Sequence, residues 1–154
     1  MLGRGVAHLT IYLPALALFL LVLPRLYGFS ALGRVPELFV FAAPFILATS
    51  FLAQAAGAWF KRRETPVLLF LATSIPQLFV VGFAWPREAI PEPVLIAGHI
   101  FPSDFAIYGL IRFNQMRASL LEAGREWSGL WIMAAVYFVL AVMLARVFKR
   151  REVQ

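Results

Sequence analysis

Residues that could carry chemistry are few and widely separated in this sequence. The two histidines, His8 and His99, have no neighbouring ligand at His-x-x-x-His spacing, and we expect them at different depths, so they predict no metal site. Serines such as Ser50 and Ser74 lie in apolar stretches, where we expect no histidine at the same depth to act as a base. A Gly-x-x-x-x-Gly-Lys-[Ser/Thr] loop, which would bind the phosphates of ATP, is absent. These patterns predict neither an enzyme nor a bound cofactor.

Asp104 is the acid that most invites a functional interpretation, because it lies between two apolar stretches. Inside a membrane protein, such a carboxylate can mark a transport path. Aspartate and serine also favour the position just before a helix, where they accept a hydrogen bond from the first turn. We therefore favour a helix cap, formed by Ser103 or Asp104, over a transport-path carboxylate.

The composition is that of a membrane protein. Hydrophobic residues make up 62% of the 154 residues and charged residues 14%, with a mean hydropathy of +0.81. A soluble domain is nearer half apolar and a quarter charged. The formal net charge of +6 does not indicate nucleic-acid binding, because the basic residues form short clusters beside apolar stretches. The absence of cysteine excludes disulfides and thiolate metal sites.

Four apolar stretches, at about residues 11–26, 37–60, 66–84 and 127–148, predict four membrane-spanning helices. The first could instead be a signal peptide, since it has a basic start and a short apolar centre, although a poor cleavage site follows. Pro76 and Gln77 lie in the middle of the third stretch. We expect Pro76 to kink that helix and Gln77 to face protein or a polar cavity.

Residues 89–126 differ from the four spans. The segment is too apolar for a solvated loop, yet it carries charged side chains at Asp104, Arg112, Arg117, Glu122 and Arg125. Each of these would cost about 2.5–3.5 kcal/mol at mid-bilayer, which is too much for a span. We predict one or two short helices that break near Pro102, lie at or dip into the outer face, and do not cross the membrane.

Two similar basic clusters indicate the topology. Lys61-Arg62-Arg63 and Lys149-Arg150-Arg151 both follow apolar spans, and an even number of spans places both clusters and both termini on one side. Because Lys and Arg near span ends favour the cytoplasm, we predict an N-in, C-in protein of a bacterial-type cytoplasmic membrane. Within the second span, Ala53-x-x-x-Gly57 matches a small-xxx-small pattern, for which we favour packing inside this protein over a dedicated dimer motif.

The order of these elements resembles the C-terminal half of ABC-2-type transporter permeases. The resemblance covers about residues 8–151 and is strongest in Val81-Gly82-Phe83-Ala84-Trp85-Pro86-Arg87-Glu88-Ala89-Ile90-Pro91, where an aromatic-Pro-x-Glu-x-x-Pro pattern leads toward outer re-entrant helices. Two further matches follow, Phe101-Pro102-Ser103-Asp104-Phe105-Ala106-Ile107 and Arg112-Phe113-Asn114-Gln115-Met116. The candidate site positions that the resemblance implies are Trp85, Pro86, Glu88, Pro91, Pro102, Ser103, Asp104, Arg112, Asn114 and Gln115.

The resemblance implies an all-α membrane protein with four transmembrane helices and a broken re-entrant or interfacial helical segment on the outer face. It also implies an exporter permease that is powered by a separate ATP-binding cassette subunit. The four spans correspond to the third to sixth of the family, so a second copy or a missing N-terminal permease half is an expected partner, together with membrane lipid. The alternative is a small four-helix membrane scaffold or assembly protein without transport activity. A membrane-embedded enzyme comes third, because no site supports it.

Overall fold

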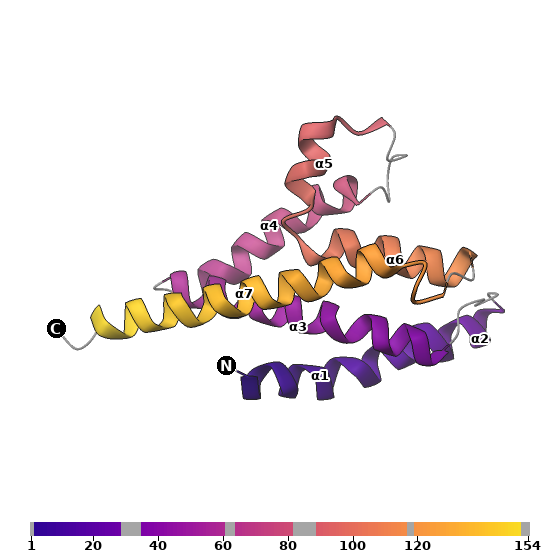
Figure 1. Ribbon diagram of the computed structural model, residues 1–154, viewed down its shortest axis with the longest axis horizontal. Helices are drawn as coiled ribbons and strands as arrows, with labels where there is room; N and C mark the ends of the chain where they lie inside the picture. The colour runs from indigo at the N-terminus through magenta and orange to yellow at the C-terminus, as the bar shows by residue number, and fades with distance from the viewer. Residues whose placement is uncertain (1, 29–34, 61–63, 82–88, 117–118, 152–154) are drawn as a thin grey trace.

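The computed structural model of this chain describes residues 2–28, 35–60, 64–81, 89–116 and 119–151. Within these residues the chain is helical, with no strand, and this confirms the predicted all-α membrane fold (Figure 1). The elements are α1 (Leu2–Ala17), η1 (Leu18–Val22), α2 (Leu23–Tyr27), α3 (Val35–Trp59), α4 (Glu64–Val80), α5 (Glu92–Gly98), α6 (Pro102–Met116) and α7 (Gly124–Arg151).

The first three elements form one helix from Leu2 to Tyr27, which begins well before the predicted start at residue 11. The turn η1 is a π-helix, in which the backbone N–H of Leu23 donates to the carbonyl of Leu18. Pro24 is the second residue after this turn, and a proline clashes with the carbonyl four residues before it in a regular α-helix. The wider π turn relieves this clash. The helix ends at Gly28, whose φ of 71° suits a residue without a Cβ.

By length and composition, three described helices can cross a membrane: Leu2–Tyr27, Pro36–Trp59 and Gly124–Val147. Helix α4 has 17 residues, or about 25 Å at 1.5 Å per residue. That is shorter than a hydrocarbon core of about 30 Å, and residues 82–84, where the third span is predicted to end, lie outside the described residues. Four crossings therefore stay a prediction.

Helix α3 lies at the centre of the bundle. It runs antiparallel to α1, since Gly5 near the start of α1 meets Phe51 in the second half of α3. It runs parallel to α7, since Trp127 reaches Val40 at one end and Phe138 stacks on Phe51 further along. Both termini of the chain therefore lie toward the same end of the bundle (Figure 1).

Two clusters of side chains fill the core. One joins α3, α6 and the start of α7, and the other joins α3 to the middle of α7. Their buried members are Leu38, Phe41, Ala106, Phe113, Ala123 and Leu130 in the first, and Ala48, Phe51, Ala134 and Tyr137 in the second.

The small residues of α3 do not share one environment. Ala48, Ser50 and Ala55 are buried, whereas Ala53 and Gly57 are exposed, and a Cβ added at Gly57 would meet no atom within 4 Å. The prediction that the Ala53-x-x-x-Gly57 face packs inside this chain is wrong for the described residues. The physical reason is rotation, because successive residues of a helix turn by about 100° and the alanines fall on different faces.

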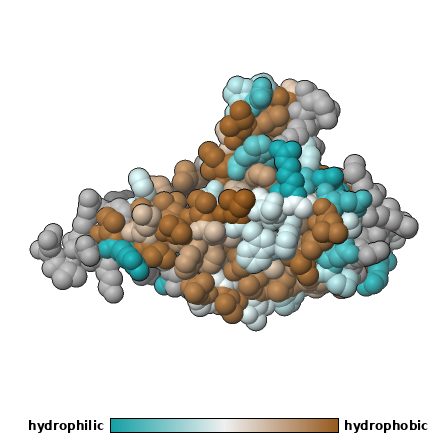
Figure 2. All heavy atoms as spheres, viewed as in Figure 1, coloured by the Kyte–Doolittle hydropathy of each residue, from teal (hydrophilic) through white to brown (hydrophobic). Residues whose placement is uncertain are grey.

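The surface matches a bilayer environment. Figure 2 shows apolar residues over much of the bundle, with hydrophilic residues gathered around α6. Many large apolar side chains of α1, α4 and α7 are exposed, among them Phe19 at 64%, Leu71 at 66% and Ile132 at 64%. In a membrane such side chains face lipid or another helix, and the hydrophilic region marks the part of the molecule where the polar contacts are concentrated.

Candidate functional site

The helical segment formed by α5 and α6 is bent by 97° between its two helices, at residues 99–101. The break near Pro102 is thus confirmed, and α5 projects from the side of the bundle (Figure 1). A break leaves backbone carbonyls without helical partners, which is costly inside a membrane. The hydroxyl of Tyr137 on α7 donates to one of them, the carbonyl of Ile100.

The break is also attached to α4. The hydroxyl of Ser103 donates to the side-chain carbonyl of Gln77 at 3.1 Å. The prediction that Gln77 faces protein is therefore confirmed, and its partner is the first turn of α6. Tyr137 therefore attaches the break to α7, and Gln77 attaches it to α4.

The depth of the break follows from its contact with α7. Tyr137 lies about 20 Å along α7 from Gly124, at 1.5 Å per residue. If Gly124 lies near one interface, the break reaches well past the surface of a hydrocarbon core about 30 Å thick. From there α6 runs back beside the first half of α7, and Phe105 contacts Gly129. By length and composition the bent pair is either a re-entrant loop or a broken span, and most of α5 is exposed, for example at Val94 and Ile96.

Asp104 is paired with a histidine inside this segment. Its carboxylate lies 2.6 Å from Nδ1 of His99, and Asp104 is buried whereas the His99 side chain is 39% exposed. The prediction of a cap at Ser103 or Asp104 is wrong in position, because α6 begins at Pro102 and both residues lie within its first turn. An acid in a first turn still interacts favourably with the helix dipole. The imidazole supplies a polar partner for the buried acid.

A polar pocket of about 270 Å³ lies between α6 and the start of α7, lined by His99, Asp104, Phe105, Tyr108, Arg125 and Glu126. Next to it, Arg112 of α6 donates to both carboxylate oxygens of Glu126 at 3.1 and 3.2 Å. One guanidinium nitrogen is thus shared between the two oxygens, and this charge-assisted contact joins α6 to α7. Glu37, near the start of α3, accepts a hydrogen bond from the backbone N–H of Leu120. The start of α3 is therefore attached to the connection between α6 and α7.

The connection into α7 contains a reciprocal pair outside the spans. Glu122 accepts from the backbone N–H of Ser119 at 2.6 Å and from its hydroxyl at 3.0 Å, and the Ser119 hydroxyl accepts from the N–H of Glu122. The backbone hydrogen bond, followed by the hydroxyl, lowers the pKa of Glu122 below its ordinary value. This arrangement has the chemistry of a capping box.

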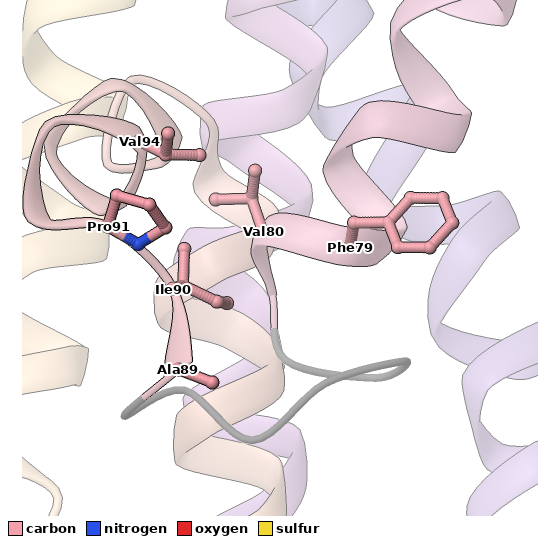
Figure 3. Close-up of a pocket in the computed structure, with 6 residues that line it drawn as sticks. All are labelled: Phe79, Val80, Ala89, Ile90, Pro91 and Val94. Carbon is pink, nitrogen blue, oxygen red and sulfur yellow. The ribbon is translucent and has the colours of Figure 1, made fainter.

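A second, apolar hollow of about 230 Å³ lies between the end of α4 and the start of α5. Figure 3 shows Val80, Ile90 and Val94 directed toward one another, with Pro91 at the entry to α5 and Phe79 turned away. Its walls offer van der Waals contact and no group for catalysis or metal binding. The end of α4 and the segment that leads into α5, which flank residues 82–88 in the sequence, therefore lie close together.

The structure brings together only part of the predicted site. Ser103, Asp104 and Arg112 each bond to a side chain from another position, as described above. Pro91 is the residue before α5, and Pro102 is the buried first residue of α6. The remaining candidates lie outside what the structure describes, as whole residues (Trp85, Pro86 and Glu88) or as side chains on α6 (Asn114 and Gln115).

One polar cluster was missed by sequence reasoning. Nδ1 of His8 lies 2.6 Å from the hydroxyl of Ser50, and the amide of Gln54 donates to the same hydroxyl at 3.2 Å. The expectation that no histidine lies at the depth of Ser50 is wrong, because α1 begins early and packs antiparallel on α3. The sequence did hold one indication that the first helix begins early: Arg4 and His8 are four residues apart, as on one face of a helix, just before the first apolar stretch. Ser74, by contrast, bonds back to its own helix at Leu71.

Among the residues that the structure describes, no group of three or more His, Asp or Glu side chains could hold a metal ion.

Residues 1–143 match the model of a protein family described as ABC-2 family transporter protein. Comparisons with curated proteins and with solved structures gave no match. The matched range includes α1 to α6 and most of α7, and hence the α5–α6 segment with its contacts to α4 and α7. The chain therefore belongs to the ABC-2 transporter family and is an integral membrane permease of an ABC-type transporter.

Proposed function

We propose that this permease forms part of an exporter whose energy comes from ATP hydrolysis on a separate ATP-binding cassette subunit. The observation that carries the proposal is the family match over residues 1–143. The printed sequence has no Gly-x-x-x-x-Gly-Lys-[Ser/Thr] loop, so in this proposal ATP acts through another chain. By resemblance, the chain supplies the C-terminal half of an ABC-2-type permease.

In this proposal the translocation path forms between this chain and a second permease segment. The described helices are packed around α3, and much of the apolar surface of α4 is exposed, for example at Val67, Leu68 and Ile75. At Gly57, where an added Cβ would meet no atom within 4 Å, a further helix would be able to approach α3 closely. A second copy of this chain, or an N-terminal permease half, would complete the path.

The α5–α6 segment supplies a plausible route for coupling. Gln77 attaches its first α6 turn to α4, and Tyr137 attaches its break to α7. A change in the position of α4 relative to α7 must therefore move the segment or break one of these hydrogen bonds. In the proposed cycle, ATP-driven movement of the spans reaches the outer side through this connection.

The experiment is to co-express the tagged chain with ATP-binding cassette subunits from the same organism, purify it, and measure ATP hydrolysis in lipid nanodiscs. We expect one such subunit to co-purify and ATP hydrolysis to require both chains. ATP turnover by the chain alone would contradict the proposal. Isolation without any ATP-binding subunit under mild detergent conditions would favour the scaffold alternative.

A variant pair tests the coupling role. Gln77→Leu removes the partner of Ser103, and we expect it to lower the ATP turnover of the assembled complex without reducing assembly. Thr73→Val is the matched control one turn earlier on α4, because the Thr73 hydroxyl bonds only to the backbone of its own helix in the described contacts, at Leu69 and Phe70. Equal turnover in the two variants would contradict the coupling role of Gln77.

A further inference from the structure

A second site lies away from the α5–α6 segment, in a groove between α1 and α3. The groove has a volume of about 630 Å³, within the range of pockets that hold small molecules. Apolar side chains such as Leu16, Phe19, Phe45 and Ile46 line its length, and Leu110 of α6 contributes to its wall. Its polar groups include His8, Thr49 and Ser50. An amphiphilic ligand suits this combination, because the groove is apolar along most of its length.

Ser50, at the polar end of the groove, bonds to the amide of Gln54, which lies behind the groove wall. The hydroxyl of Ser50 accepts a hydrogen bond from the amide nitrogen of Gln54 and lies 2.6 Å from Nδ1 of His8. The amide oxygen of Gln54 is buried and has no hydrogen-bond partner among the described residues. A buried acceptor without a donor is unfavourable, most of all beside hydrocarbon. A hydroxyl-bearing ligand in the groove meets Ser50 and Thr49 directly, and it pairs with the Gln54 oxygen only if that side chain turns toward the groove.

A positive charge lies close to the same end. Arg4 precedes His8 by one helical turn on α1 and is exposed, and residues four apart lie on the same face of a helix. A guanidinium binds phosphate oxygens through paired N–H groups, and an imidazole can add a further donor. The charge and the donors favour an anionic phosphate group over a neutral one.

The position of the cluster along both helices matches a lipid headgroup boundary. His8 lies about 9 Å from the first residue of α1, and Gln54 lies about 8 Å from the last residue of α3, at 1.5 Å per residue. Trp59, at the end of α3, is a typical interface residue. The cluster is therefore expected near the boundary between headgroups and hydrocarbon on the side of the N-terminus.

The length of the groove matches one lipid leaflet. From His8 to Leu20, α1 rises about 18 Å, close to half of a hydrocarbon core about 30 Å thick. Phe19 and Leu20, which line the groove, belong to the π turn η1. Such turns are frequent at functional sites because they change the direction of the side chains.

We propose that the α1–α3 groove binds one acyl chain of an anionic glycerophospholipid from the leaflet that surrounds the N-terminus. The lipid phosphate lies by Arg4 and His8, its hydroxyl-bearing headgroup reaches Ser50, and its chain lies along the groove toward Phe19. This site does not depend on the ATPase partnership, because it needs only this chain and the bilayer.

The test uses the full chain in nanodiscs with two photoreactive lipids, phosphatidylglycerol and phosphatidylcholine, that carry the same diazirine in the acyl chain. We expect labelling to concentrate on residues 12–20 and 45–53, with phosphatidylglycerol labelling these residues about fivefold more, the ratio expected for one basic residue near a membrane surface. Arg4→Gln together with His8→Leu should bring this ratio to about one.

Two variants locate the bound chain. Ala53→Phe places a ring in the groove from an exposed position, and we expect it to remove the labelling at residues 12–20. Val136→Phe is the control, because Val136 is exposed on α7 and does not line the groove. It should leave the labelling unchanged.

Equal labelling of the groove by the two lipids would overturn the proposal. The proposal would also be overturned if labelling were spread evenly over the exposed faces of α1, α4 and α7 and if Ala53→Phe did not change it. The alternative occupant of the groove is a helix from a second copy of this chain. Disulfide formation between chains that carry Thr49→Cys, without groove labelling, would assign the site to that copy and also overturn the proposal.

Discussion

At the scale of single residues, the contact between α3 and α6 depends on a glycine. A Cβ added at Gly109 would lie 2.0 Å from the ring of Phe41. Phe41 is fully buried and stacks edge-on with Phe113 at a centroid distance of 5.1 Å. Because the ring is enclosed on several sides, it has little room to move away from a larger residue. Gly109 therefore determines how closely α6 approaches α3.

We predict that Gly109→Ala lowers the free energy of unfolding by about 1–3 kcal/mol, the usual cost of overpacking a core. Gly57→Ala is the control, because its added Cβ meets no atom within 4 Å. It should be neutral or stabilise the helix by up to about 1 kcal/mol. Thermal unfolding in detergent, followed by tryptophan fluorescence, measures both, and an unchanged midpoint for Gly109→Ala would show that α6 does not pack as described.

At the scale of elements, the α5–α6 segment is a broken helix held by side chains of its neighbours. Its break carries hydrogen bonds from Tyr137 and to Gln77, and α6 is held further along by Arg112 and Glu126. Gly98 allows the close contact of α5 with α4, since a Cβ there would meet Val80 at 2.2 Å. The bend is thus maintained by tertiary contacts as well as by Pro102.

We predict that Tyr137→Phe increases amide hydrogen exchange at residues 99–104 by about 2- to 12-fold, since a typical intramolecular hydrogen bond contributes about 0.5–1.5 kcal/mol. Exchange in the buried middle of α3 should not change, because the aromatic ring stays in place. Tyr12→Phe is the control, since Tyr12 is exposed on α1. A uniform rise over all helices after Tyr137→Phe would mean global destabilisation and would contradict a local role.

At the scale of the whole molecule, the directions of the helices determine which of their ends lie together. Helix α1 runs antiparallel to α3, and α7 runs parallel to it, so the start of α1 and the end of α7 lie toward one end of the bundle. The basic clusters of the sequence are at this same end if each span crosses once. The orientation of that end toward the cytoplasm follows from the preference of Lys and Arg for the inner side.

We predict four crossings with both termini cytoplasmic. The chain has no cysteine, so single cysteines can be introduced without background. Labelling with a membrane-impermeant maleimide should reach cysteines placed at Glu92 and Glu122 from outside. Cysteines placed after Arg63 and at Gln154 should react only after permeabilisation. Labelling of Gln154 from outside, or of Glu92 and Glu122 from opposite sides, would contradict this topology.

Much of the fold was predictable because it depends on local properties of the chain. Apolar stretches of sufficient length form helices in a bilayer whatever their neighbours are, since every backbone group must be bonded within the segment. Pro102 likewise indicates a helix boundary, because a proline lacks an N–H and restricts the residue before it. The requirement that Gln77 face protein also follows from its own polarity, although its partner Ser103 is 26 positions away.

The amino-acid sequence by itself determined the membrane class, the helical elements, the break at Pro102 and the resemblance to ABC-2 permeases. Only the tertiary structure decided that His8 meets Ser50 across 42 positions, that Gly109 receives Phe41, and that Ala53 and Gly57 remain exposed. It also placed Asp104 against His99 within the first turn of α6 instead of before it. The physical reason is that hydropathy and proline act within one segment, whereas these contacts depend on the relative rotation and depth of packed helices.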